Sequence, residues 1–276
     1  MKLLNIVENF ISIEYSKILE NMELKNHFHN SHEIIYVING QAEIYINRKI
    51  YKLNKGSIAF ISNLEDHELK VLKPPYERFY MLIKPEYFQS VINHPKLASI
   101  FIHRPDNFEH VMTFSEQEHD DALFLLKKLY AEYWGRHDFW EYSINSLIAQ
   151  LFVLIYRNDA HRFPMAVINP LTNTIFEIQK YIESHFTEGI SLEDLSRQFY
   201  VNMYHLSRSF KAVTGFGFRD YVILQRLSQA KDLLLHTSDS VTKICMDSGF
   251  SNVNHFIRIF KKHEGVTPYK YRKLSR

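Results

Sequence analysis

The last third of the chain contains one local pattern twice, and this repetition restricts the fold more than any other feature. In each copy a serine that can cap a helix, Ser191 or Ser240, precedes a short segment with apolar residues at helical spacing. A brief break follows, after which Asn202 or Asn252 can cap a second segment. The repetition predicts two helix-turn-helix units within an all-helical domain.

The second segment of each copy is amphipathic. Its apolar side is formed by Leu206, Phe210 and Val213 in the first copy, and by Phe256, Ile259 and Phe260 in the second. The opposite face presents Tyr204, Ser207, Arg208 and Lys211 in the first copy, and Val253, Asn254, Arg258 and Lys261 in the second. An apolar back with a polar, basic front suits a helix that reads base edges and neutralises phosphates in the major groove. We predict that these eight residues contact double-stranded DNA; the alternative is that the arginines are ordinary solvated charges and the tyrosine a packing aromatic.

The spacing and the charge of this region agree with that prediction. Residues 218–236 show one continuous helical pattern, and a helix of these 19 residues is about 28 Å long. Successive major grooves on one side of B-DNA lie about 34 Å apart, so such a connector suits a chain that reads two neighbouring grooves. Residues 171–276 hold 15 Lys and Arg against 10 Asp and Glu, whereas residues 1–170 hold 18 against 21. An excess of positive charge favours a polyanionic partner.

The domain organisation is predicted to be α+β and multidomain. The expected limits are residues 1–157 for a β-rich domain that ends in helices, 158–170 for a linker with Pro164 and Pro170, and 171–276 for the helical domain. A membrane-spanning apolar stretch and the basic-then-apolar order of a secretory leader are both missing, which predicts a cytoplasmic protein without a membrane partner. Cys245, the single cysteine, is expected in a helical core.

The N-terminal region shows short β-type runs. Residues 34–38 and 42–46 flank Asn39-Gly40, a dipeptide suited to tight turns, and predict a hairpin. Further strands are expected at residues 49–53, 57–61, 68–72 and 78–83. Many short strands at this spacing indicate a sandwich or a small barrel.

Two helical patterns follow these strands, at residues 123–133 and 144–155. Helices this rich in apolar and aromatic side chains need a surface to cover. We expect them to pair with the same helices of a second copy and form a homodimer. The alternative is that they only cover the sheet of their own domain.

The C-terminal residues resemble the AraC/XylS family of transcription regulators across nearly all of 171–276. The resemblance rests on the segments SLEDL (191–195), LSRSFK (206–211), FIRIFKK (256–262) and GVTP (265–268), among others. It places the base-contacting positions of the family at Tyr204, Ser207, Arg208, Val253, Asn254 and Arg258. Two departures are Asn202, where the family usually has serine, and Cys245, where alanine is usual.

The region around His27, His29, His32, Glu33 and His67 resembles the cupin-like sensor domains of the same family. In metal-binding cupins, histidines at alternating strand positions share one face with a glutamate and a distant histidine, an order that is present here. We nevertheless expect no metal or other cofactor, because regulators of this type usually bind organic effectors or nothing in this pocket.

An effector pocket is expected at His29, Glu33, Tyr36, Tyr45 and His67. Aromatic and polar side chains together suit a sugar or another small polar molecule. The alternative is an ordinary β core whose aromatic residues bind no ligand.

These features predict a dimeric DNA-binding regulator that is not an enzyme. By its resemblance to the family we expect an activator that works with RNA polymerase and responds to a small molecule, such as a carbohydrate, through the N-terminal domain. The rival hypotheses are a metal-binding cupin enzyme with an accessory helical domain, and an adaptor that uses its helices only for protein contacts. The first rival would need bound metal near His29 and His67, and the second predicts no sequence-selective DNA binding.

Overall fold

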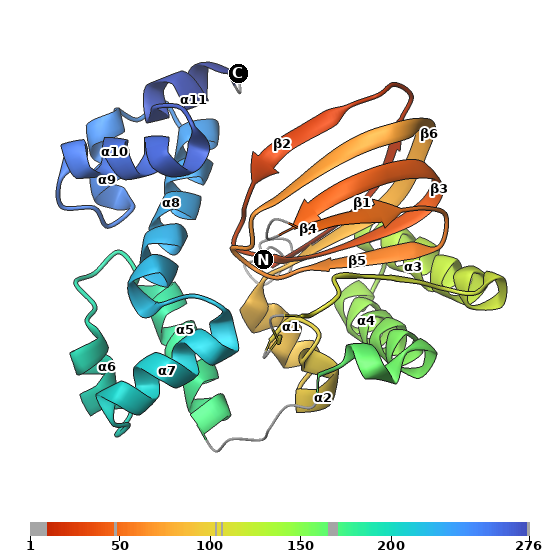
Figure 1. The fold of residues 1–276 in the computed structure, drawn as a ribbon, viewed down its shortest axis with the longest axis horizontal. Helices are drawn as coiled ribbons and strands as arrows, with labels where there is room; N and C mark the ends of the chain where they lie inside the picture. Colours follow the sequence, from red (N-terminus) through yellow and green to blue (C-terminus); the bar gives the residue numbers. More distant parts are fainter. Residues whose placement is uncertain (1–9, 47–48, 103, 106, 165–170, 275–276) are drawn as a thin grey trace. The chain divides into compact units, whose positions relative to one another are not determined.

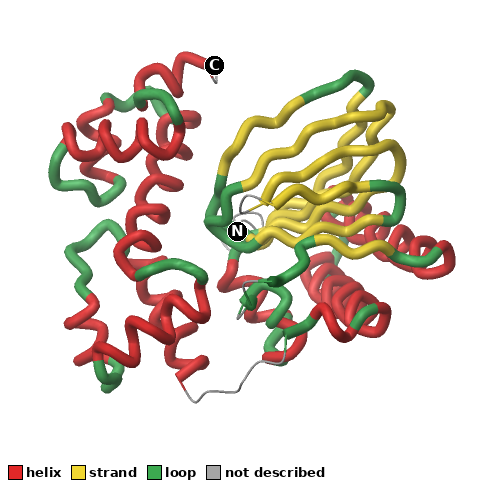
Figure 2. The backbone as a smooth tube through the Cα atoms, viewed as in Figure 1, coloured by secondary structure: helices red, strands yellow, loops and turns green. Residues whose placement is uncertain are grey.

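The computed structural model describes residues 10–46, 49–102, 104–105, 107–164 and 171–274, and the chain divides into two compact units, residues 1–167 and 168–276. Every described strand belongs to the N-terminal unit, and the described part of the C-terminal unit consists of helices and loops (Figure 2). None of the described helices combines the length and the apolar character needed to cross a bilayer.

The N-terminal unit is built on one antiparallel sheet (Figure 1). Its strands are β1 (Ile11–Ile18), β2 (Glu23–His27), β3 (His32–Ile46), β4 (Lys49–Leu53), β5 (Ser57–Ile61), β6 (His67–Ile83) and β7 (Val111–Thr113). They follow the order β1-β6-β3-β5-β7, with β2 also paired to β6 and β4 also paired to β3. The long strands β3 and β6 therefore form the central ribbon.

The predicted hairpin at Asn39-Gly40 is wrong, because both of its runs belong to the single strand β3. The pairing of β3 with β6 shifts register around Gly40, which has φ +84°, so the positive φ serves a bulge rather than a turn. A Cβ at Gly40 would lie 2.5 Å from the carbonyl oxygen of Pro75. The strands expected at 68–72 and 78–83 likewise form one strand, β6.

The β3–β6 ribbon folds over at this bulge, so that its two ends meet. Glu33 pairs with Leu82 at one end of the ribbon and His67 pairs with Ile46 at the other, yet His67 Nε2 lies 3.0 Å from Glu33 Oε2. Between the ends, the inner face of the sheet carries a cluster of buried aliphatic side chains that includes Ile35, Val37, Ile44 and Leu69. The folded ribbon thus places polar side chains at its joined ends beside an apolar interior.

Helices cover the other face of the sheet. They are α1 (Pro85–Val91), α2 (Pro95–Ala98), α3 (Glu116–Gly135) and α4 (Trp140–Asn158), followed by the short 3-10 helix Ala160–Arg162. Trp134 of α3 donates a hydrogen bond of 3.0 Å from Nε1 to the carbonyl oxygen of Ile13 in β1. Beyond α4, Phe163 is buried and packs on Tyr156 with ring centroids 5.1 Å apart.

The C-terminal unit contains α5 (Leu171–His185), α6 (Leu192–Gln198), α7 (Met203–Thr214), α8 (Phe218–His236), α9 (Val241–Asp247), α10 (Val253–Glu264) and α11 (Pro268–Leu274). In Figure 1, α6 and α7 lie near one end of α8, and α9, α10 and α11 lie near the other. The helix predicted at residues 218–236 agrees with α8 at both ends. Cys245 is buried, as expected.

Candidate nucleic-acid interface and histidine cluster

Helix α7 is the second helix of the first predicted helix-turn-helix. Its first turn is capped by Asn202, whose Oδ1 accepts a hydrogen bond of 3.0 Å from the backbone N–H of Tyr204. Leu206 and Phe210 are fully buried, and the Phe210 ring packs edge-on against Tyr221 of α8. The four residues predicted to face DNA, Tyr204, Ser207, Arg208 and Lys211, are all exposed.

Helix α10 has the same design. Asn252 Oδ1 accepts a hydrogen bond of 2.9 Å from the backbone N–H of His255, and Phe256 and Phe260 are fully buried. Of the predicted contact residues, Asn254, Arg258 and Lys261 are exposed and Val253 is half-buried. Ile259, which the pattern places on the apolar side, is also only half-buried.

The two helices correspond residue by residue at a distance of fifty positions along the chain. The capping asparagines 202 and 252, the arginines 208 and 258, the lysines 211 and 261, and the left-handed C-terminal glycines 215 and 265 are the matching pairs. Each helix therefore presents an arginine and a lysine from equivalent places on the same scaffold.

The charge on these faces has one sign. α7 contains no acidic residue, and the one acidic residue of α10, Glu264, has a buried side chain that pairs with Lys231 Nζ at 3.0 Å. Acidic residues begin the neighbouring helix α6 at Glu193 and Asp194. All exposed charged side chains of α7 and α10 are therefore basic, which suits contact with phosphates.

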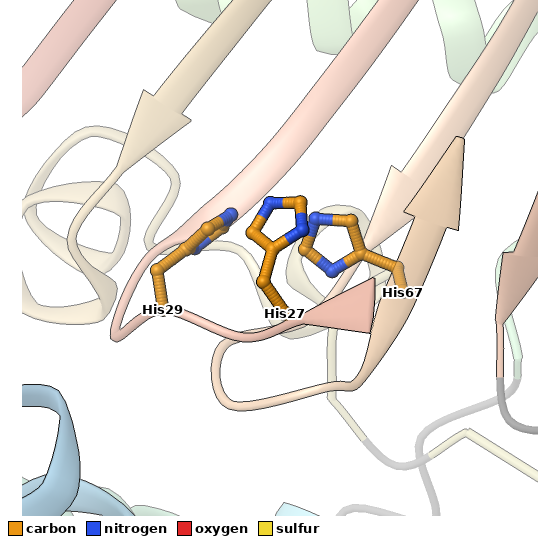
Figure 3. Close-up of side chains that lie close together, drawn as sticks. All are labelled: His27, His29 and His67. Atoms are coloured by element: carbon orange, nitrogen blue, oxygen red, sulfur yellow. The ribbon is translucent and has the colours of Figure 1, made fainter. Parts of the chain in front are cut away.

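In the N-terminal unit, the structure brings His29 and His67 together and adds His27 (Figure 3). Glu33 lies between His29 and His67. Glu33 Oε2 lies 3.2 Å from His29 Nε2 and 3.0 Å from His67 Nε2. The rings of His27 and His67 have centroids 4.2 Å apart. These side chains come from the end of β2, the loop after it and the first residues of β3 and β6.

Burial and close charges shift the pKa values in this cluster. Burial, with His67 beside it, lowers the pKa of His27 to about 4, so this imidazole is neutral near pH 7. Burial opposes the charge on Glu33, but His29 and His67 more than offset this and hold its pKa well below the usual range. Burial would lower the pKa of His67, but the Glu33 carboxylate raises it.

The tyrosines predicted for the same pocket lie elsewhere. Tyr36 alternates with Ile35 and Val37 of the inner cluster, so it faces the helices, where its hydroxyl donates to the carbonyl oxygen of His119 at 3.1 Å. Tyr45 likewise lies between inward residues of β3 and therefore points to the outer side. The structure does not bring either tyrosine to the histidine cluster.

Two buried polar residues of β6 were missed in the sequence. Tyr76 belongs to the inner cluster, and Arg78 follows it at the strand period of two, on the same face. The Tyr76 hydroxyl and Arg78 Nε are buried without a hydrogen-bond partner in the described part of the chain. Arg78 at an inward strand position was the available signal. It was missed because residues 68–72 and 78–83 were predicted as separate strands with a break at Pro74-Pro75, so the alternation of inward residues across the break was not visible.

Comparison with known proteins decides the family. Residues 15–152, half of the chain, match the family model of the AraC-like ligand binding domain, and residues 195–274 match that of a helix-turn-helix domain. The chain belongs to the AraC/XylS family of transcription regulators. This result confirms the resemblance and the predicted fold class.

Relatives of this family member include two curated bacterial proteins. An uncharacterised HTH-type transcriptional regulator of Staphylococcus aureus (strain COL) is 25% identical over 88% of this chain. The regulatory protein PocR of Salmonella typhimurium is 36% identical over 34% of the chain. In both, the aligned part spans 31% of the relative's length, so this chain covers about a third of the curated relatives that it matches.

Among solved structures, ToxT from Vibrio cholerae has the same fold. The likeness covers 95% of this chain and 98% of that chain, with a TM-score of 0.62 and 14% sequence identity. At this identity the comparison concerns the fold alone.

Proposed function

We propose that the chain is a sequence-specific DNA-binding transcription regulator, in which α7 and α10 enter successive major grooves. The exposed faces of these two helices, whose charges are all positive, carry the proposal. Tyr204, Ser207, Arg208, Val253, Asn254 and Arg258 are the base-contacting candidates, and Lys211 and Lys261 are the phosphate-contacting candidates. Helix α8, which has 19 residues and is about 28 Å long, sets the distance between the two helix-turn-helix units.

Binding to a promoter fragment and to a scrambled fragment, measured by fluorescence anisotropy over a range of salt concentrations, tests this proposal. Genome-wide occupancy of the full chain in its host first supplies the promoter. We expect the promoter to be preferred by about 10³-fold or more, with a steep loss of affinity as salt rises. Equal affinity for both fragments, or binding that is insensitive to salt, would contradict the proposal and favour the adaptor hypothesis.

We further propose that the regulator acts as a homodimer through α3 and α4. A groove between these helices is lined mainly by apolar side chains, with one acidic and one basic residue: Asp121, Phe124, Leu125, Ser146, Ala149, Gln150, Val153, Leu154 and Arg157. In a two-fold interface the same surface meets itself, so Asp121 of one copy can pair with Arg157 of the other. Phe124 is 57% exposed, which leaves apolar surface for a partner to cover.

The N-terminal unit is proposed to bind a small-molecule effector on the inner face of its sheet, and the regulator to activate transcription together with RNA polymerase in the cytoplasm. His29, Glu33 and His67 remain candidates for polar contacts, with Tyr76 and Arg78 added by the structure. A sugar is the effector expected by family resemblance. A ToxT structure from Vibrio cholerae strain SCE256 contains an unsaturated fatty acid, and the aliphatic inner face suits such a chain as a second candidate.

To regulate the protein, an effector must bind one state of the regulator more tightly than the other, because a ligand with equal affinity for both states does not shift the equilibrium between them. Titration of the full chain with sugars and with fatty acids, followed by thermal stability and promoter affinity, separates the candidates. A ligand that raises stability but leaves promoter affinity unchanged would not be the effector.

A further inference from the structure

The three clustered imidazoles are all oriented by the same kind of contact. Nδ1 of His27 lies 2.9 Å from the carbonyl oxygen of Lys25, Nδ1 of His29 lies 3.1 Å from that of Ser31, and Nδ1 of His67 lies 2.9 Å from that of Glu65. A carbonyl oxygen only accepts, so each Nδ1 carries the proton and donates it. In the neutral form of each ring, Nε2 then has a free lone pair.

These lone pairs meet in a small space that also contains a carboxylate. One ring nitrogen from each histidine lies within 4.8 Å of those of the other two (Figure 3). Glu33 Oε2 is 3.2 Å from His29 Nε2 and 3.0 Å from His67 Nε2. Bonds of about 2.0 Å from a tetrahedral ion to its ligands place the ligand atoms roughly 3.3 Å apart. The two distances from Glu33 are close to this value, and the three histidine nitrogens, which lie within 4.8 Å of one another, need only small side-chain movements to reach it.

Hydrogen bonding within the cluster leaves one nitrogen unused. His67 Nε2 is buried and makes no hydrogen bond in the described structure, although Glu33 Oε2 lies 3.0 Å away. Protonating two or three of these rings would place like charges side by side. A single divalent cation instead accepts all three lone pairs and balances the carboxylate.

The surroundings fix the ligands in place. The backbone carbonyl of Glu65 orients His67. The Glu65 side chain is fixed in turn, because Arg104 Nη1 lies 2.8 Å and His110 Nε2 lies 3.0 Å from its carboxylate oxygens. Histidines that bind metal ions usually donate their second ring N–H to a carbonyl or carboxylate in this way. The cluster therefore has both the ligand atoms and the supporting contacts of a metal site.

We propose that the N-terminal unit binds one divalent transition-metal ion, of the class that includes Zn²⁺, through Nε2 of His27, His29 and His67 and the carboxylate of Glu33. Imidazole and carboxylate ligands together suit Zn²⁺, Fe²⁺ and Ni²⁺ rather than Ca²⁺ or Mg²⁺. This site goes beyond the proposed function and departs from the expectation of a regulator without a metal. It stands whether or not the chain binds DNA.

Equilibrium dialysis of the untagged full chain, stripped with a chelator, against ZnCl₂, NiCl₂ or CaCl₂ tests the site. We expect one Zn²⁺ per chain that binds tightly and no comparable uptake of Ca²⁺. Cobalt(II) should show the visible absorption of an ion with nitrogen ligands in a site of low symmetry. Less than one Zn²⁺ per chain at saturation would overturn the proposal.

Variants identify the ligands. His27→Ala and His29→Ala remove half-buried side chains, so the fold should persist, and each should weaken Zn²⁺ binding by about 100-fold or more. His137→Ala and His161→Ala remove exposed histidines of the same unit and should leave binding unchanged. Equal affinity in the cluster and control variants would overturn the assignment. A rise in the melting temperature with Zn²⁺, present in the wild type and absent in His29→Ala, gives a second readout independent of stoichiometry.

Discussion

Arg208 and Arg258 occupy the same position on two similar helices, six residues after a capping asparagine. Both are exposed, and neither helix carries an exposed acidic side chain beside them. An arginine guanidinium can bind both acceptors of guanine at once, so a residue at this position can carry sequence preference as well as charge. Lys211 and Lys261, three residues later, add positive charge but lack the planar, forked donor geometry of arginine.

Replacing either arginine by alanine should therefore weaken promoter binding by about 1–3 kcal/mol and relax base preference at one position. Competition binding with a set of single-base operator variants measures both effects. Arg197→Ala is the matched control, because Arg197 is an exposed arginine on α6 that pairs with Glu193. An equal loss on every operator variant would mean that the arginine contacts only phosphate.

At the scale of elements, the turn between α9 and α10 is set by close packing. Gly249 has φ +83°, and a Cβ there would lie 2.6 Å from Cα of Thr187. Gly265, after α10, has a similar φ of +71° but nothing within 4 Å of a Cβ. A side chain at Gly265 would therefore cause backbone strain alone, whereas a side chain at Gly249 would also collide with the backbone of Thr187.

Gly265→Ala should lower the free energy of unfolding by about 1 kcal/mol through strain alone, and Gly249→Ala should lower it by clearly more. Urea unfolding followed by far-ultraviolet circular dichroism measures the helical unit. Trp134 and Trp140 both lie in the N-terminal unit, so tryptophan fluorescence gives an internal control that should not change. Equal losses in the two variants would show that the Thr187 backbone moves away without cost.

Lys231 and Glu264 join α8 to α10 by a buried ion pair of 3.0 Å. Lys231→Met leaves the carboxylate buried without this lysine, and should cost about 3–5 kcal/mol in unfolding free energy. The double variant Lys231→Met/Glu264→Leu should recover most of that loss, because no charge is left in the interior. A double variant as unstable as the single one would show that the site needs the charges for its shape.

At the scale of the whole molecule, the proposed dimer would connect the two activities proposed for the N-terminal and C-terminal units. A second copy would double the number of helices available to a promoter, and an effector that changes the dimer would change how they engage it. The groove between α3 and α4, which side chains of both helices line, is the surface proposed for this dimer.

A charge placed in this groove should break the dimer. Val153→Glu and Phe124→Glu are expected to convert a dimer into a monomer in sedimentation velocity, and to weaken binding to promoters with paired sites. Leu72→Glu changes an exposed apolar residue of β6 and should have no effect. Unchanged sedimentation of the groove variants would move the interface to another surface.

Much of the helical unit was predictable because its information is local. Helix limits follow from capping residues such as Ser191 and Asn252, and the exposed face of α7 follows from the spacing of Leu206 and Phe210, since a helix repeats every 3.6 residues. Short-range geometry alone therefore named Arg208 and Arg258 as exposed residues. The sheet gave less: β4 and β5 were predicted, but β3 was divided at Asn39-Gly40, because a positive φ suits a bulge as well as a turn.

The histidine cluster depends on contacts between distant parts of the chain. His67 reaches Glu33 only because the β3–β6 ribbon bends at Gly40 and brings its ends together, an effect of strand pairing that no local period contains. The same bend turns Tyr45 to the outer side, away from the residues with which it was grouped. The resemblance to cupin-like domains was enough to nominate His27, His29, Glu33 and His67, whereas the direction of each ring nitrogen came from the folded backbone whose carbonyl oxygens hold them.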